Sequence, residues 1–104
     1  MTYLIVWRFV PKTESTAEFE RAYGEHGLWV DFFRQGRGYL CTEFLRNVDR
    51  PQEYVTCDYW ESEEDFRAFR REHREEYDRL DRECERLTIE EISVGVFETG
   101  KENR

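Results

Sequence analysis

The segment YLIVWRFV at residues 3–10 constrains the fold most, because the strand that it predicts is apolar on both sides. Alternate side chains of a strand face opposite ways, so the odd and even positions form two separate faces. The odd positions are all apolar, and Arg8 is the one charged residue among the even positions. The sequence therefore predicts a sheet in which neither face of this strand is left to water.

Three further strands are predicted, at 39–46, 53–60 and 88–97. The turn-forming sequence NVDRPQ joins the first two of them, so we expect them to pair as an antiparallel hairpin.

Two helical segments separate these strands. The first begins with STAE at 15–18, which has the pattern of a capping box, and Gly24 and Gly27 should bend it or divide it into two short helices. The second begins at Ser62 and is expected to run as one helix to about Leu87.

The resulting order is strand, helix, strand, strand, helix, strand. This order predicts a ferredoxin-like α+β fold, in which two helices cover one face of a four-stranded antiparallel sheet. We expect a single domain over 1–97 and a flexible tail at 98–104. Because two helices cover only one face, the other would expose a larger apolar patch than a monomer tolerates. We therefore predict a homodimer whose open sheet faces pack together.

Charge and composition exclude several classes of function. The net charge is -8, and in the sequence no Lys/Arg cluster stands clear of acidic neighbours, so we expect neither nucleic acid nor a membrane as partner. The longest apolar run, at 3–7, is too short for a membrane span or a signal peptide, which favours a cytoplasmic protein. The sequence has no phosphate-binding, hydrolase or metal-binding motif, so we expect no metal and no cofactor.

The three cysteines, Cys41, Cys57 and Cys84, lack the close spacing of zinc or redox sites. An odd number of cysteines favours buried free thiols. A disulfide between Cys41 and Cys57 across the predicted hairpin remains an alternative, which a cytosolic redox environment disfavours.

A histidine interrupts the apolar stripe of the second helix. The apolar positions 66, 69, 77, 80 and 84 recur at helical spacing, and His73 fills the gap between them. One interpretation is a general base that lines an apolar pocket, with its pKa lowered by partial burial. The other is a structural histidine that is hydrogen-bonded to a backbone carbonyl or a tyrosine.

The first helical segment raises the same question at His26, although the glycines beside it could turn this residue toward solvent. The many aromatic residues could wall a cavity for a flat ligand or could simply fill the core. The candidate substrate-binding residues are Tyr23, Trp29, Phe33, Trp60, Phe69 and Tyr77.

Arg8 and Asp58 are the unusual polar residues of the strands. The first and third strands are neighbours in the predicted order, so these two residues could pair. An ion pair near a solvated strand end is the favoured interpretation.

With these elements placed, the chain resembles the antibiotic biosynthesis monooxygenase (ABM) family of dimeric α+β barrels over residues 2–97. The resemblance rests on the element order, on YWES at 59–62, on FRAFRREHREEYDRL at 66–80 and on EHG at 25–27. It implies an aromatic substrate bound between helices and sheet. Some members help to remove a phenolic proton and let the anion react with O₂ without metal or flavin.

Other members of the family degrade haem, using an Asn on the first strand and a Trp/His pair on the second helix. The first strand here has no Asn, and Phe69 stands where that Trp would fall. Haem degradation is therefore not expected.

Two hypotheses follow. The first is a homodimer that binds a small aromatic or apolar molecule and acts as a cofactor-independent monooxygenase of phenols or quinols, with His73 as proton acceptor. The second is a non-catalytic dimer that binds a ligand or serves as a structural partner. A pocket touched by His73 would favour the first hypothesis, and a solid core the second.

Overall fold

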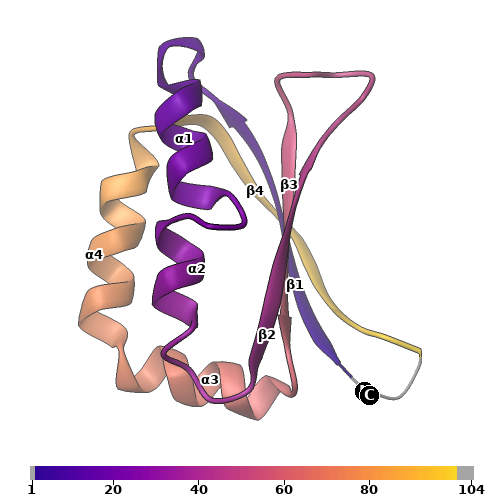
Figure 1. Cartoon of the computed structure of the whole chain (residues 1–104), viewed down its shortest axis with the longest axis vertical. Helices are drawn as coiled ribbons and strands as arrows, with labels where there is room; N and C mark the ends of the chain where they lie inside the picture. Colours follow the sequence, from indigo (N-terminus) through magenta and orange to yellow (C-terminus); the bar gives the residue numbers. More distant parts are fainter. Residues whose placement is uncertain (1, 101–104) are drawn as a thin grey trace.

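The computed structural model of the protein describes residues 2–100, which form a four-stranded antiparallel sheet in the order β2-β3-β1-β4. All the α-helices within this range lie on one face of the sheet (Figure 1). This arrangement confirms the predicted ferredoxin-like α+β fold. The elements are β1 (Tyr3–Pro11), α1 (Thr16–Tyr23), α2 (Leu28–Phe33), β2 (Tyr39–Arg46), β3 (Tyr54–Trp60), α3 (Glu63–Glu72), α4 (Arg74–Glu85) and β4 (Thr88–Glu98), with a 3₁₀ turn at Thr13–Ser15.

Each predicted helical segment is divided into two helices. The break between α1 and α2 falls at Gly24 and Gly27, as the sequence predicted. The break between α3 and α4 was not predicted, and it falls at His73, whose φ of -117° and ψ of 31° are not helical.

The length of the sheet explains the second break. A straight helix over residues 63–87 would be about 38 Å long. The central strands β1 and β3, with 9 and 7 residues, span about 23–30 Å, and the edge strand β4, with 11 residues, spans about 36 Å. The chain therefore changes direction at His73, so that α3 crosses the end of the sheet and α4 returns along it (Figure 1).

The capping prediction holds for α3 and fails for α1. Ser62 Oγ accepts a hydrogen bond of 3.1 Å from the backbone N–H of Asp65. Ser15 makes no such bond at the start of α1. The Glu18 carboxylate pairs instead with Arg86 just after α4, and this contact ties the ends of two helices together.

The two faces of the sheet have different surroundings. On the helix side, Ile5 and Phe9 of β1 are buried in an aromatic core that contains the fully buried Trp60. By strand register, the even positions of β1 lie on the opposite face. Exposed apolar side chains beside them include Leu45, Ile92 and Phe97. Within residues 2–100 of a single subunit, no helix covers this face, which we call the open face.

The three cysteines are free, but only Cys84 is buried. Cys57 is half-buried and Cys41 is exposed, so the prediction of a buried thiol is wrong for Cys41. In the hairpin register Cys41 lies opposite Tyr59, and Cys57 lies opposite Glu43. The two thiols are therefore not directly opposed.

The end of β4 includes the first residue of the predicted tail, Glu98. The backbone N–H of Thr99 then donates to the carbonyl of Thr2 at 3.0 Å. The rest of the predicted flexible tail, residues 101–104, lies outside the described residues. Within residues 2–100, no helix has the length and apolar character needed to cross a membrane.

Gly38 provides a test of the connection between α2 and β2. Its φ of +86° is strained for residues with a side chain, and an added Cβ would lie 2.3 Å from an oxygen of the Asp65 carboxylate. We predict that Gly38→Ala lowers the free energy of unfolding by about 1–3 kcal/mol in urea titrations. Gly100→Ala is the control, because nothing lies within 4 Å of its added Cβ. Equal stability of the two variants would contradict the prediction.

Candidate functional site

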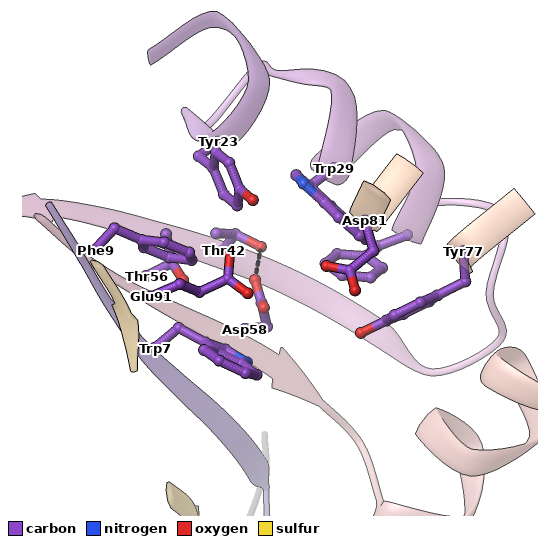
Figure 2. A pocket seen from close by; sticks show the side chains of 11 residues that line it. Trp7, Phe9, Tyr23, Trp29, Thr42, Thr56, Asp58, Tyr77, Asp81 and Glu91 are labelled. Atoms are coloured by element: carbon purple, nitrogen blue, oxygen red, sulfur yellow. Dashed lines mark hydrogen bonds between the residues drawn. The ribbon is translucent and has the colours of Figure 1, made fainter. Parts of the chain in front are cut away.

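A small pocket lies between the helices and the helix-covered face of the sheet (Figure 2). Its cavity volume is about 50 Å³. That is about a third of the ~150 Å³ cavity that admits benzene, so in this conformation the pocket has room only for a few waters. It is lined by Trp7, Phe9, Tyr23, Trp29, Phe33, Thr42, Thr56, Asp58, Tyr77, Asp81 and Glu91.

Asp58 occupies the sheet side of this pocket. The even positions of β3 are buried and the odd positions half-buried, so strand alternation alone turns Asp58 toward the helices. Its exposed fraction is 9%. A charged side chain in such a place needs a partner, because burial without one is costly.

Thr42, on the neighbouring strand β2, supplies that partner. Its hydroxyl donates a 2.7 Å hydrogen bond to Asp58 Oδ1 (Figure 2). The Tyr39 hydroxyl lies 2.7 Å from the same Thr42 oxygen. Since the single Thr42 proton points to Asp58, Tyr39 is the donor in this second bond. A chain of two hydroxyl groups thus holds one carboxyl oxygen, and among residues 2–100 no other hydrogen bond to the Asp58 side chain is found.

Burial raises the pKa of Asp58 from 3.8 to about 6, and the hydrogen bond from Thr42 only partly opposes this shift. Near neutral pH the carboxyl group can therefore both accept and return a proton. A group with these properties in a pocket is a candidate for acid–base chemistry.

Two more carboxyl groups, Asp81 of α4 and Glu91 of β4, line the same pocket. Burial raises the pKa of both, and the nearby Asp81 carboxylate raises the pKa of Glu91 further. Burial also raises the pKa of Tyr77 to about 12, so its hydroxyl is a neutral donor at physiological pH. No lysine, arginine or histidine within the described part of the chain lines the pocket, which is therefore acidic.

Trp29 presents a buried indole N–H at this site. The nitrogen lies near the Tyr23 hydroxyl and the Cys84 thiol but makes no hydrogen bond of ordinary geometry with residues 2–100. In Figure 2 the indole nitrogen points toward the Tyr23 side of the pocket. A buried donor of this kind is costly, and a ligand acceptor would satisfy it.

Of the six predicted substrate-binding residues, four line the pocket and two do not. Trp60 and Phe69 are packed in the core beneath it. The residues at the pocket are Tyr23, Trp29, Phe33 and Tyr77.

Neither histidine lines this pocket. His26 is exposed and borders a separate surface groove beside α4. His73 is half-buried at the turn between α3 and α4, where its ring packs 4.7 Å from the Phe69 ring and 5.9 Å from the Phe32 ring, measured between centroids. The structure therefore gives His73 the position of a helix terminator packed on aromatic rings.

The predicted pairing of Arg8 with Asp58 is wrong. The register of β1 and β3 places the two side chains on opposite faces of the sheet. Arg8 pairs instead with Glu53 at 2.8 Å and with Glu90 at 3.4 Å. The sequence did contain a signal for Asp58. It lies an even number of positions from Tyr54 and Trp60 in the same strand, so it shares their buried side.

Within residues 2–100, no group of three His, Cys, Asp or Glu side chains is arranged to hold a metal ion.

The fold and this pocket define an α+β protein with an acidic, aromatic-lined pocket between helices and sheet, and comparison with known proteins identifies its family. The family model described as "Antibiotic biosynthesis monooxygenase" matches residues 2–78. The chain belongs to this ABM family. Among curated proteins, none matches the chain.

Solved structures of similar fold agree with this assignment. SnoaB from Streptomyces nogalater, described as a cofactor-independent oxygenase, is 22% identical with a TM-score of 0.75, over 97% of this chain and 95% of SnoaB. Rv0793 from Mycobacterium tuberculosis is 17% identical with a TM-score of 0.72, over 100% of both chains. At these identities the likeness shows the fold alone.

The buried Asp58 carboxyl group makes stability depend on pH. Its raised pKa means that the folded state binds the proton more tightly than the unfolded state, so its contribution to stability is lost as pH rises from about 4 through about 6. Asp58→Asn removes this loss and keeps an acceptor for Thr42. We predict that the variant gains about 1–3 kcal/mol over the wild type at pH 8 relative to pH 4.

Urea unfolding at both pH values measures this gain. Asp49→Asn, in the exposed hairpin turn, is the matched control and should show no comparable gain. A gain for Asp58→Asn that is the same at pH 4 and pH 8 would contradict the burial of an ionising carboxyl group.

Proposed function

We propose that this protein is a homodimeric, cofactor-independent monooxygenase that acts on a small phenol or quinol, with Asp58 as the proton acceptor. Membership of the ABM family supports this proposal, and a protein of the same fold is described as a cofactor-independent oxygenase. The observation that carries it is a buried carboxyl group, with a pKa raised to about 6, on the wall of an aromatic pocket.

The surroundings of Asp58 suit an aromatic substrate. The rings of Trp7, Trp29 and Tyr77 lie around the carboxyl group (Figure 2) and offer faces and edges for contact with a flat molecule. The carboxyl group is held on one side by Thr42, so a substrate hydroxyl would approach its other oxygen.

The proposed reaction converts a phenol and O₂ into a quinone and water. Asp58 takes the phenolic proton, and the electron-rich ring carbon forms a bond to O₂. The resulting peroxide anion takes that proton back from Asp58. The carboxylate then removes the hydrogen from the same ring carbon while the O–O bond breaks, and the departing hydroxide takes up this proton to form water. The substrate supplies all four electrons that reduce O₂ to the quinone oxygen and water, and Asp58 ends unchanged.

Binding of an aromatic ring requires the pocket to widen. Trp7 and Tyr77 are only half-buried, and both also border a larger groove along α3. Movement of these two rings would join the pocket to the groove. This is the access route that we propose for the substrate.

The homodimer is proposed on the open face of the sheet. Leu4 and Val6 of β1 lie on this face beside Phe97 of β4, and no helix of the described chain covers them. A second copy presents the same apolar surface, so two open faces can pack against each other.

A non-catalytic ligand-binding dimer is the second candidate. The observation that favours it is the small volume of the pocket, about 50 Å³, within a core that is otherwise filled by aromatic rings. Such a core needs no catalytic explanation for its aromatic residues.

Oxygen uptake with naphthol and with naphthohydroquinone tests the catalytic proposal. We predict that Asp58→Asn lowers kcat by about 10²- to 10⁴-fold, because it removes the proton acceptor. Wild-type activity should rise as pH increases through about 6, as the Asp58 carboxyl group ionises.

His73→Asn is the control for that experiment and should keep kcat within about twofold of the wild type. A large loss in this variant, with Asp58→Asn unaffected, would return the role of proton acceptor to His73. No uptake with any phenol or quinol would favour the non-catalytic candidate.

A charge on the open face tests the homodimer. We predict that Val6→Glu converts the wild-type dimer into a folded monomer in sedimentation experiments, because burial of the new carboxylate between two sheets is costly. Val48→Glu, at a position 90% exposed in the hairpin turn, should remain a dimer. A wild-type protein that sediments as a monomer at high concentration would refute the dimer.

A further inference from the structure

A groove of about 560 Å³ adjoins the pocket on the side of α3 and the start of α4. Its floor is apolar and includes Ile5 of β1 and Val96 of β4. Trp7 and Tyr77 line both the groove and the pocket, so they form the wall between the two. The groove is therefore part of the surface that a substrate meets before it reaches Asp58.

Four arginines line the helix side of this groove: Arg67, Arg70, Arg71 and Arg74. Their spacing of i, i+3, i+4 and i+7 places them on one helical face and continues across the break at His73. In the sequence acidic residues flank them at 63–65 and 75–76, and Glu72 stands among them. The fold gathers these four guanidinium groups on one side of the groove, although acidic neighbours remain at Glu63 and Asp78.

Most of these guanidinium groups have no carboxylate partner within the described chain. Arg67 pairs with Glu63 at 2.6 Å. Arg70, Arg71 and Arg74 form no ion pair with residues 2–100, although Asp78 also lines the groove. The Arg70 guanidinium lies 4.7 Å from the centre of the Tyr77 ring, on the wall shared with the pocket.

Other exposed arginines, such as Arg79 and Arg82, also form no ion pair with residues 2–100. What distinguishes the arginines of the groove is that they gather along one side of it, next to aromatic side chains.

Arg70 already contacts the Tyr77 ring and acts on the Asp81 carboxyl group. Arg71 and Arg74 are therefore the two available for an anion from outside, and the planar guanidinium group matches a carboxylate.

We propose that this groove binds the carboxylate group of a hydroxylated aromatic acid, whose ring lies against Trp7 and Tyr77. This inference rests on the proposed function and names its substrate class. The hydroxyl end enters the pocket beside Asp58, and the carboxylate end stays with Arg71 and Arg74.

The charges of the two neighbouring sites fix this orientation. Asp58, Asp81 and Glu91 make the pocket acidic, so they repel a carboxylate and accept a neutral hydroxyl group. The apolar floor of the groove suits an aromatic body better than a free inorganic anion. The net charge of -8 disfavours a polyanion such as nucleic acid.

Calorimetric titration of the full-length protein without oxygen tests the inference. The probes are naphthol and the hydroxynaphthoate that carries its hydroxyl and carboxyl groups on opposite rings. We expect the wild type to bind hydroxynaphthoate about tenfold more tightly than naphthol at low salt. The double variant Arg71→Gln/Arg74→Gln should bind hydroxynaphthoate with about tenfold lower affinity than the wild type, and its affinity for naphthol should fall by less than about twofold.

The double variant Arg79→Gln/Arg82→Gln is the matched control, because it removes the same charge from exposed positions of α4 outside the groove. It should bind both probes as the wild type does. Thermal unfolding checks that each variant is folded, and Arg71→Lys/Arg74→Lys should recover part of the lost affinity because the charge remains.

Equal wild-type affinity for the two probes, or equal losses for both in the glutamine variant, would overturn the inference. So would loss of hydroxynaphthoate binding in the control, or binding of a DNA duplex that depends on Arg71 and Arg74. The outcome is separable from that of the proposed function. If the protein binds hydroxynaphthoate more tightly than naphthol but takes up no oxygen, the carboxylate-binding groove stands and the oxygenase activity is refuted. If oxygen is taken up with the same KM for both probes, the oxygenase activity stands and the carboxylate-binding groove is refuted.

Discussion

The site depends on one buried carboxyl group and the hydroxyl that holds it. Asp58 faces the helices because strand alternation leaves it no other side, and Thr42 on the adjacent strand donates to it at 2.7 Å. Burial raises its pKa to about 6, so the group titrates closer to neutral pH than an exposed aspartate does. The same burial costs stability whenever the group ionises, as is common at functional sites.

The arrangement of helices follows from how this site is covered. Helices α1 and α2 bring Tyr23, Trp29 and Phe33 over the sheet, and α4 brings Tyr77 and Asp81. The turn at His73 lets α3 cross the end of the sheet while α4 returns along it (Figure 1). Because α3 continues the arginine stripe into the start of α4, a basic groove lies directly beside an acidic pocket. The rings of Trp7 and Tyr77 line both of them.

Sequence reasoning reached the fold because the relevant signals are local. The two-sided apolar strand at 3–10, the hairpin turn at 47–52 and the Ser62 cap each act over a few residues. The sequence predicted the helix break at Gly24 and Gly27, because glycines mark it. It did not predict the break at His73, which no glycine or proline marks. The register of β1 against β3 was also not readable, so Arg8 was paired with a residue on the opposite face.

The sequence predicted only part of the candidate site. Aromatic residues at helical spacing predicted Tyr23, Trp29, Phe33 and Tyr77, but Trp60 and Phe69 carry the same signal and lie in the core. The sequence favoured a histidine as proton acceptor, because the ordinary pKa of histidine is close to neutrality. An aspartate gains such a pKa only through burial, which the three-dimensional structure creates. A polar residue on the buried side of a strand was the sign that pointed to it.

The proposed role of Asp58 requires that its carboxyl group titrate inside the pocket with a pKa well above that of an ordinary aspartate. Carboxyl-carbon NMR of the protein labelled at aspartate, titrated over the acidic and neutral range, measures this directly. The Asp58 signal, assigned by its loss in the asparagine variant, is predicted to titrate with a midpoint near 6. A midpoint near 4, the ordinary value for aspartate, would contradict the account.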